Sequence, residues 1–459
     1  MTEERTEDDF EEDYALSGDL VEQVLAATEA QDAPLLTELL EPLHPADIAD
    51  LLEQVGSHDR RELLRLYGPE MDGEILTEID ESIREEVIEQ LPAEVLAEAV
   101  RELDSDDVVD LIEDLEEPQQ EAILEALDES DRAAVEQSLT WPEYSAGRLM
   151  QREVVTAPAH WTVGEAIDFL RAEEWLPDQF YHVVLVDPGH HPVGYVTLGK
   201  VLASKRDVAL ASITEDSFRT IWARQEEADV AYAFNQYHLI SAPVVDDDDR
   251  LVGVITIDDA MNVLDEEHEE DILRLAGVGD ESSISDSVAE TVRQRLPWLM
   301  VNLLTAIIAS GVIALFEGTI ERLVALAVLM PIVASMGGNA GTQTLTVAVR
   351  ALATKSLTES NVWRVIRREA VVGFANGAVF AAVMGAVAWV WFGAPELGVV
   401  IGVAMVINLF VAALAGIAVP LALERLGADP ALASGTFVTT VTDVVGFFAF
   451  LGLAGLVLL

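Results

Sequence analysis

The stretch Thr436–Phe450, TFVTTVTDVVGFFAF, places a single acid, Asp443, in the middle of an apolar run. A carboxylate at the centre of a membrane costs roughly 2.5–3.5 kcal/mol on insertion scales, and such residues usually face an ion path, a proton path or a polar partner. Transport is therefore the first hypothesis that this stretch supports. The alternative is a structural Asp that bonds a neighbouring helix or lies near the end of its span.

Asp443 belongs to the fifth of five apolar spans, Pro430–Leu459. The other four contain no charged residue: Leu296–Phe316, Leu323–Val349, Ala370–Pro395 and Leu397–Leu423. A helix of about 20 apolar residues crosses a hydrocarbon core of about 30 Å. The sequence therefore predicts an all-α transmembrane pore domain of five helices over residues 296–459.

Basic residues indicate the orientation of this domain. They follow the second span and precede the first, at Arg350, Lys355, Arg364, Arg367, Arg368, Arg293 and Arg295. Because cytoplasmic loops are enriched in Lys and Arg, we expect a multi-pass protein of the cell membrane with its N-terminal part in the cytoplasm and its C-terminus outside. The first residues, MTEERTEDDFEEDY, contain no apolar stretch, and we do not expect a signal peptide there.

The charge of the chain is divided unevenly between its two parts. The net charge is −57 over 459 residues, and the first 290 residues carry 75 acids and only 17 bases. Such an excess is typical of proteins that stay soluble in concentrated salt, where self-repulsion is screened. It argues against a nucleic-acid partner, whose phosphates would be repelled. The absence of cysteine excludes disulfides and thiolate metal sites.

The first part of the chain is repetitive. From Ile79 an apolar residue recurs every 12 residues, at Leu91, Leu103, Leu115, Leu127 and Leu139. Each unit opens with turn or cap residues and continues for about two helical turns. Short helices at a fixed period stack into a superhelix, because one unit cannot bury its apolar stripe alone. We therefore predict a helical superhelical N domain over residues 1–140, with a role in interaction or regulation.

The next part, residues 147–263, contains two copies of a small α/β unit. His182–Asp187 matches Ser241–Asp246, and Val193–Thr197 matches Val252–Thr256, both at an offset of 59 residues. The copies, Gly147–Asp207 and Val208–Val263, resemble a tandem pair of CBS domains. That resemblance implies binding of an adenine nucleotide such as ATP, with a ribose contact made by a Thr and an Asp three residues later. The second copy has Thr256 and Asp259, whereas the first has Thr197 and Lys200. A purely structural pair without nucleotide is the alternative.

Residues 264–295 are predicted to connect these modules to the membrane, beginning as an acidic helix. Glu267, Glu270 and Asp271 share one helical face, and Asp258 and Asp259 lie just upstream. Like charges so placed repel unless a cation bridges them. The alternative is a solvated face of a salt-adapted protein.

The second span contains a polar and glycine-rich stretch. Pro331 is followed by Gly337, Gly338, Asn339, Gly341, Thr342 and Gln343. We expect this span to be broken rather than one plain helix, since irregular backbone at membrane depth is tolerated where it is buried or lines a wet cavity. Together with Asp443 and nearby hydroxyls such as Thr439, it predicts a lined path.

Two motifs then carry a specific resemblance. Pro331-x4-MGGNAGTQ-x6-RALAT and DPALASGTFVTTVTDVVG, Asp429–Gly446, are similar to the MgtE family of magnesium transporters or channels, and the order of parts fits over nearly the whole chain. The resemblance implies a homodimer in membrane lipid with the pore on the dimer axis. It also implies a pore aspartate at Asp443 and cytosolic magnesium-sensing acids among Asp258, Asp259, Glu267, Glu270 and Asp271. Its glycine-rich pore-lining segment falls on Gly337, Gly338, Asn339, Gly341, Thr342 and Gln343, and we place Thr439 in the same lined path.

The chemistry of magnesium agrees with this reading. Mg²⁺ is typically held by one or two carboxylates and keeps several waters, and two copies of Asp443 would supply such a pair. Gating by cytoplasmic Mg²⁺ follows as an expectation. Transport of another hard divalent cation, Mn²⁺ or Ca²⁺, remains an alternative, as does a membrane-anchored CBS nucleotide sensor. We do not expect an enzyme, because we find no nucleophile–base pair or phosphate loop.

Overall fold

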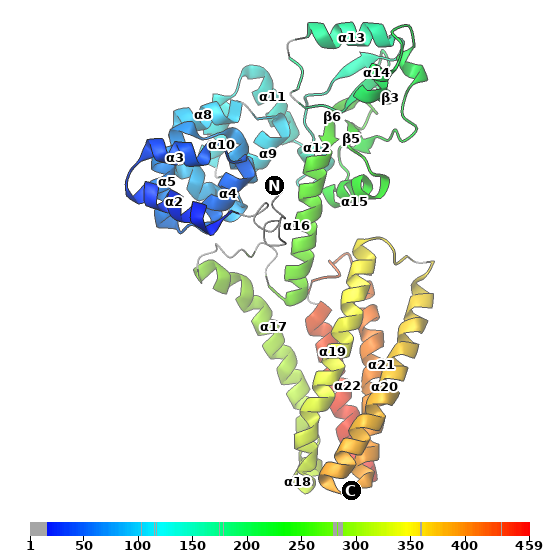
Figure 1. Ribbon diagram of the computed structural model, residues 1–459. Coiled ribbons are helices and arrows are strands. Elements are labelled where there is room, and N and C mark those ends of the chain that lie inside the picture. Colours follow the sequence, from blue (N-terminus) through cyan, green and yellow to red (C-terminus); the bar gives the residue numbers. More distant parts are fainter. Residues whose placement is uncertain are drawn as a thin grey trace, which may run out of the picture. The chain divides into compact units, whose positions relative to one another are not determined.

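The computed structural model describes residues 16–459 except 102, 114, 116, 174, 178, 279–281, 283–287, 359 and 433 (Figure 1). The chain divides into two compact units, Met1–Glu266 and Glu267–Leu459, and each is considered by itself. The acidic N-terminal segment on which the signal-peptide prediction was made lies outside the described residues.

The first unit begins with a stack of short helices. They are α2 (Gly18–Glu29), α3 (Ala33–Leu40), α4 (Pro45–Gln54), α5 (Ser57–Tyr67), α6 (Gly73–Glu78), α7 (Glu81–Gln90), α8 (Ala93–Arg101), α9 (Ser105–Glu113), α10 (Glu117–Ala126) and α11 (Glu129–Ser138). The predicted 12-residue repeat is visible in α7 to α11. Its apolar residues Ile79, Leu91 and Leu115 lie between consecutive helices and are buried, so the repeat marks the joints of the stack.

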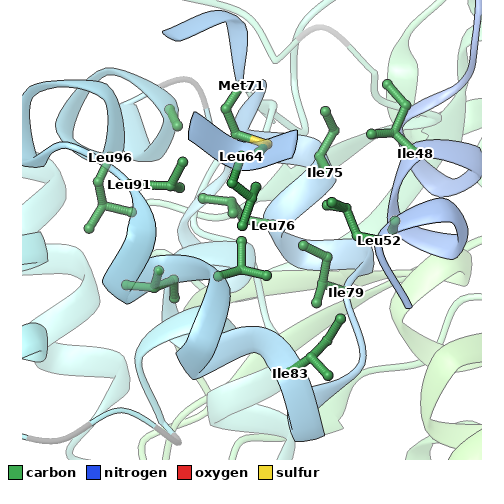
Figure 2. Packing of buried hydrophobic residues seen from close by; sticks show 14 of the residues in the cluster. Ile48, Leu52, Leu64, Met71, Ile75, Leu76, Ile79, Ile83, Leu91 and Leu96 are labelled. Carbon is green, nitrogen blue, oxygen red and sulfur yellow. The ribbon is translucent and has the colours of Figure 1, made fainter. Parts of the chain in front are cut away.

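The core of this stack is made by residues from successive helices (Figure 2). Leu52 of α4, Leu64 of α5 and Ile75 and Leu76 of α6 lie in one buried cluster, which continues through Ile83 of α7. Each helix is too short to be stable alone in water. The stack is therefore held by burial between neighbouring helices rather than by the helices themselves.

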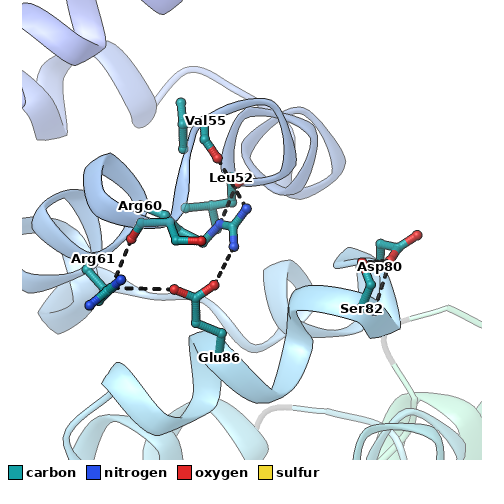
Figure 3. A network of polar contacts seen from close by, with 8 residues as sticks. Leu52, Val55, Arg60, Arg61, Asp80, Ser82 and Glu86 are labelled. Atoms are coloured by element: carbon teal, nitrogen blue, oxygen red, sulfur yellow. Dashed lines mark hydrogen bonds and ion pairs between the residues drawn. The ribbon is translucent and has the colours of Figure 1, made fainter. Parts of the chain in front are cut away.

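One buried arginine joins three helices of the stack (Figure 3). Arg60 of α5, 3% exposed, donates from Nε to the Leu52 carbonyl at 2.8 Å and from Nη2 to the Val55 carbonyl at 3.2 Å. Its Nη1 pairs with Glu86 Oε2 of α7 at 2.7 Å. The guanidinium thus satisfies carbonyls left open at the end of α4, which offsets the cost of its burial.

Two small sheets follow the helical stack. The first has the order β1 (Thr156–Pro158), β2 (His182–Val186), β3 (Pro192–Thr197), and the second has the order β4 (Ile221–Trp222), β5 (Ser241–Val245), β6 (Leu251–Thr256). In both, the first pair is parallel and the second antiparallel. The register pairs His182 with Thr197 and Ser241 with Thr256, so the predicted offset of 59 residues holds in three dimensions. Helices α13 (Val163–Ala172), α14 (Leu198–Ala203) and α15 (Glu227–Tyr237) accompany the sheets.

Helix α16 (Ile257–Ala276) leaves directly from β6, rather than beginning at Leu264 as the sequence indicated. The reason is local. Thr256 stands at the junction, and its backbone N–H and hydroxyl both reach Asp259 Oδ2, at 3.4 and 2.8 Å, in the manner of a helix cap. Asp258 and Asp259 therefore occupy the first turn of α16.

The second unit contains five helices that are long and apolar enough to cross a membrane. They are α17 (Val288–Ala314), α19 (Ala325–Ala353), α20 (Val362–Phe392), α21 (Pro395–Arg425) and α22 (Ser434–Val457), with a short α18 (Glu317–Arg322) after the first. The predicted fold class, a helical N domain, a tandem pair of α/β modules and a five-helix membrane domain, is confirmed.

Helices α20 and α21 form a closely packed hairpin. Gly393 ends α20 in the left-handed conformation, with φ +65°, and α21 begins at Pro395. A methyl group added at Gly398 would lie 2.5 Å from the Gly385 carbonyl oxygen, and one at Gly377 would lie 2.9 Å from the Val406 Cα. The glycines thus let the two backbones approach directly, as small residues do in membrane bundles.

The prediction that the second span is broken is wrong. Helix α19 runs without interruption through Pro331 and the glycine-rich stretch. Its interior glycines do not bend the chain. They are instead the points at which α21 and α22 come close, since Gly416 of α21 could carry no side chain without meeting the Gly341 carbonyl at 2.7 Å. Packing, rather than irregular backbone, explains the composition of this span.

Candidate functional site

Asp443 lies in the N-terminal half of α22 and is half-buried. Thr436, Thr439 and Thr440 precede it at helical spacing, so the four residues share one face. The hydroxyls of Thr439 and Thr440 donate to the carbonyls of Gly435 and Thr436, at 2.8 and 2.6 Å, which leaves their oxygen lone pairs directed outward. Within the part of the chain that the structure describes, no side chain donates a hydrogen bond to the Asp443 carboxylate or pairs with it.

A matching polar face runs along α19. Its exposed members are Ser335, Asn339, Thr342, Gln343 and Thr346. Asn339 Nδ2 lies 3.4 Å from Ser335 Oγ, and the Thr346 hydroxyl donates to the Thr342 carbonyl at 3.0 Å. A methyl group at Gly338 would lie 3.9 Å from Thr439 Cγ2, so the two polar faces adjoin along α19 and α22. In the single chain this surface is uncovered.

Two of the predicted lining residues have a different position. Gly337 and Gly341 are buried, and a methyl group at Gly341 would lie 2.6 Å from Val438 Cγ1. They face the neighbouring helices α21 and α22 and not the polar face. Their periodicity of four places them on the side of α19 opposite Asn339 and Gln343, which explains why proximity in sequence misassigned them.

A third helix contributes to the polar surface. The Thr436 hydroxyl donates to Asn302 Oδ1 of α17 at 2.9 Å. Sequence reasoning did not single out Asn302, although an amide within an apolar span is a usable signal.

Asp258 and Asp259, two of the predicted sensing acids, meet a second set of acids from the helical stack. Asp106 and Asp107 open α9, and Asp104 precedes it. Burial, followed by the negative charge of Asp259, raises the pKa of Asp106 well above its ordinary range. Burial, followed by the charges of Asp104, Asp110 and Asp258, raises the pKa of Asp107 to about 7. The first turns of α9 and α16, together with Asp104 just before α9, therefore bring five carboxylates into mutual repulsion.

The same repulsion acts on the predicted sensing residue Asp259. Burial, followed by the charge of Asp258, raises its pKa to about 7, although a hydrogen bond from Thr256 opposes the shift. The acidic residues of the stack were too numerous for sequence reasoning to choose Asp104, Asp106 and Asp107 among them. In the structure the first turn of α9 lies beside the first turn of α16, so the charges of Asp106 and Asp107 act on Asp259.

These carboxylates lie close to one another but do not form a complete metal-binding site. Among the described residues, no group of three or more His, Asp or Glu side chains is arranged to hold a metal ion directly. The donor set nevertheless fits Mg²⁺, which takes oxygen ligands, needs only one or two carboxylates and retains waters between itself and the remaining groups. A bound cation would offset the mutual repulsion of these carboxylates.

The remaining predicted sensing residues lie at the other end of α16. Glu270 pairs with Arg274 at 2.8 Å, and Arg274 also pairs with Asp429 at 2.7 Å. Burial, followed by the charge of Asp429, raises the pKa of Asp271. Glu267, half-buried, lies one turn earlier in α16. The acids that the sequence grouped together are thus divided between the two ends of one helix and cannot share a single ion.

The predicted ribose contact is engaged within the protein. The Thr256 hydroxyl lies 2.8 Å from Asp259 Oδ2 and also contacts Asp258. The adjacent cavity between the two modules measures about 20 Å³, which is room for about one water. His182 and Ser241, at equivalent positions of the two copies, close it with a contact of 2.5 Å between Nδ1 and Oγ. An adenine nucleotide would require the modules to separate.

Protein-family models match the membrane domain, the helical stack and the two α/β modules separately. A family model described as a divalent cation transporter, MgtE, matches residues 330–453. The MgtE intracellular N domain matches residues 43–144, and the CBS domain matches residues 146–207 and 216–266.

Curated relatives extend across the domains. The magnesium transporter MgtE of Enterococcus faecalis is 34% identical over 321 residues, which is 70% of this chain and 71% of the relative. That of Thermus thermophilus is 34% identical over 319 residues, 69% of this chain and 70% of the relative. A crystal structure of the cytosolic domain of the Mg²⁺ channel MgtE in complex with ATP is 28% identical and covers 53% of this chain and 99% of that chain, with a TM-score of 0.49. From its matched domains and these relatives, the chain belongs to the MgtE family of magnesium transporters.

Proposed function

We propose that Mg²⁺ crosses the membrane along the polar face shared by α19 and α22, with Asp443 as its principal contact. The observation that carries this proposal is the half-buried Asp443 carboxylate, which has no donor or counter-ion among the described residues and stands beside threonine hydroxyls on an uncovered face. An uncompensated charge in hydrocarbon is costly. A hydrated cation that passes Asp443 would neutralise this charge and remove the cost, whereas a purely structural role for Asp443 would leave the charge uncompensated.

A second copy of the chain completes the path. One carboxylate is a weak site for Mg²⁺, whereas two carboxylates related by a two-fold axis match its preference for few charged ligands and retained water. The uncovered faces of α19 and α22 are the surface that such a dimer covers. The amide and hydroxyl groups of Asn339, Thr342 and Gln343 then face the path and hold the water shell.

Cytoplasmic Mg²⁺ controls the flux through the acids of the first unit. With little Mg²⁺, repulsion among Asp106, Asp107, Asp258 and Asp259 opposes the packing of α9 against α16. Bound Mg²⁺ offsets it and favours the packed state. A cation shifts such an equilibrium only through its differential affinity for the two states. We assign the packed state as the closed one, which makes the control negative feedback. Glu267, Glu270 and Asp271 contribute a separate site near the membrane domain.

The N-terminal domains are cytoplasmic, and the C-terminus of α22 lies outside the cell membrane. ATP acts as a regulator that separates the two CBS modules and contacts Thr256 and Asp259. Because the described residues contain no phosphate loop, nucleotide regulates transport and does not drive it.

The test is cation uptake into proteoliposomes that contain the full chain. Asp443→Ala removes charge and ligand and is expected to abolish Mg²⁺ uptake. Asp443→Asn keeps the shape and is expected to lose most of it. Uptake of Mn²⁺ and Ca²⁺ by the unmodified protein determines which hard cation is preferred. An Asp443→Ala protein that assembles normally and transports Mg²⁺ at the full rate would falsify the assignment of the path.

A further inference from the structure

A buried amide lies in the interior of the membrane bundle. Asn408, in the middle of α21, is 0% exposed, and its Nδ2 donates to the Val333 carbonyl of α19 at 2.8 Å. Its Oδ1 is buried and has no hydrogen-bond partner among the described residues. Amides between membrane helices hold them together by such bonds. The half-satisfied carboxamide shows that this position is not filled for packing alone, since an apolar residue of similar size would leave no oxygen orphaned.

Two glycines, one from each helix of the polar face, make room for this carboxamide. A methyl group at Gly337 of α19 would lie 2.9 Å from Asn408 Cγ, and its three nearest atoms would all belong to the Asn408 side chain. A methyl group at Gly446 of α22 would lie 2.8 Å from Asn408 Nδ2, again with all three nearest atoms in Asn408. The amide is therefore held between the backbones of α19 and α22.

Both glycines lie close to the proposed ion path. Gly446 is three residues after Asp443, within one turn of α22, and Gly337 is next to Gly338, which adjoins Thr439 across the polar face. The separation of the two backbones at Asn408 therefore determines how far the Asp443 carboxylate stands from the amides of α19. A change of side chain at residue 408 acts on the ion path without touching it.

We propose that Asn408 is a positioning residue that sets the spacing of α19 and α22 and thereby the affinity and selectivity of the ion path at Asp443. This inference rests on the proposed function, because it takes Asp443 as the ion contact. It assigns Asn408 no contact with the ion. Its effect travels through its contacts with Gly337 and Gly446 and through its bond to the Val333 carbonyl.

The first experiment compares Asn408→Leu with the unmodified chain in proteoliposomes. Leu has the same branching at Cγ and the same number of side-chain heavy atoms, but it cannot donate to the Val333 carbonyl. We expect an assembled protein whose apparent KM for Mg²⁺ rises several-fold and whose preference for Mg²⁺ over Mn²⁺ falls, with a smaller change in maximal rate. An assembled Asn408→Leu protein with unchanged KM and unchanged preference overturns the proposal.

A second experiment tests the spacing itself. Gly446→Ala places a methyl group against the carboxamide and is expected to weaken assembly, measured as thermal stability of the solubilised protein. Asn408→Ala removes the obstructing atoms, so the double variant is expected to regain stability, a strong non-additivity typical of groups in contact. Gly377→Ala is the matched control, because its methyl group would meet the Val406 backbone and Asn408→Ala cannot relieve it. Equal defects of Gly446→Ala with and without Asn408→Ala overturn the proposal.

Measuring Asp443→Asn in parallel separates the proposed ion path from the proposed positioning role of Asn408. Normal transport by Asp443→Asn would remove the proposed path whatever Asn408 does. Loss of transport in Asp443→Asn, together with unaltered affinity in Asn408→Leu, would leave the path in place and remove the positioning role.

Discussion

Arg274 Nη1 lies 2.7 Å from Asp429 Oδ2 and 2.8 Å from Glu270 Oε2. Asp429 belongs to the short segment between α21 and α22, and Leu275, the neighbour of Arg274, packs against the apolar cluster of Leu345 and Val438. The end of α16 is thus fixed, by one ion pair and one apolar contact, to the base of the helix that carries Asp443. In the proposed function, this link connects the end of α16 to the ion path.

Arg274→Gln is expected to weaken this link and to raise the internal Mg²⁺ concentration needed for half-inhibition. The charge of Arg274 is lost while Glu270, Asp271 and Asp429 remain, so repulsion opposes the described state. A partly exposed ion pair contributes about 1 kcal/mol at most, which corresponds to a shift of about fivefold. The measurement is Mg²⁺ flux in proteoliposomes with Mg²⁺ titrated on the cytoplasmic face. Arg425→Gln, at an exposed arginine that ends α21, is the matched control. A midpoint that shifts equally in both variants would contradict the role of the pair.

The raised pKa values of Asp107 and Asp259, both about 7, predict a pH-dependent stability of the first unit. An unfolded Asp ionises near pH 4, whereas these two keep their protons in the packed state until about pH 7. Stability is therefore highest near pH 4, falls as pH rises to about 7, and changes little above that. Because bound Mg²⁺ replaces the protons, it should raise the Tm strongly at pH 8 and weakly at pH 5.

Asp107→Asn removes one of these charges and should reduce both the fall in Tm and the effect of Mg²⁺ at pH 8. Tryptophan fluorescence of the full chain during heating at pH 5 and pH 8 measures both. Glu94→Gln changes the net charge equally on an exposed part of α8 and should leave the profile unaltered. A Tm that rises between pH 5 and pH 7 without Mg²⁺ would show that these carboxylates do not dominate.

The absence of cysteine in the chain makes the proposed dimer simple to test. Thr439→Cys places a unique thiol on the polar face of α22, where two copies should approach across the axis. We expect mild oxidation in membranes to give a disulfide-linked dimer. Phe437→Cys, 45% exposed on another side of the same helix, should remain monomeric on denaturing gels. Cross-linking of Phe437→Cys in preference to Thr439→Cys would place the interface elsewhere.

The two CBS copies offer a paired test of nucleotide binding. Thr256→Val removes a hydroxyl bonded to Asp259, whereas Thr197→Val removes its counterpart, which caps the helix containing Lys200. If ATP contacts the second copy, calorimetry should show weakened binding only for Thr256→Val. No heat from the folded, unmodified protein at millimolar ATP would remove ATP as a regulator, and equal loss in both variants would argue against the assigned site.

The sequence was sufficient for the architecture because each part has a strong period. Ile79 and its repeats fall at helix joints, the offset of 59 residues pairs His182 with Ser241, and five apolar runs become five helices. Asp443 could be proposed from the sequence because one acid in an uncharged span has few competitors. Asn408 gave the same signal, as the single amide of its span, and could have been found by extending the argument from charge to polarity.

Other features depended on contacts that no local pattern contains. Asp104, Asp106 and Asp107 are three of many acids until α9 is placed beside Asp259. Gly337 and Gly341 read as breaks in a helix, because glycine disfavours helices in water. In a membrane bundle the same residues allow a neighbouring helix to approach, and the gain in packing keeps α19 intact.

The glycine-lined hairpin of α20 and α21 bears on the order in which the bundle is built. Both helices precede α22 in the chain, and their backbones meet through Gly377, Gly385 and Gly398 with no contribution from it. During synthesis this hairpin can therefore form as a unit, and its Asn408 belongs to the surface that Gly446 of α22 meets. Helix α22 then inserts against that surface, so its carboxylate enters the bilayer beside helices already assembled and is never required to cross it alone.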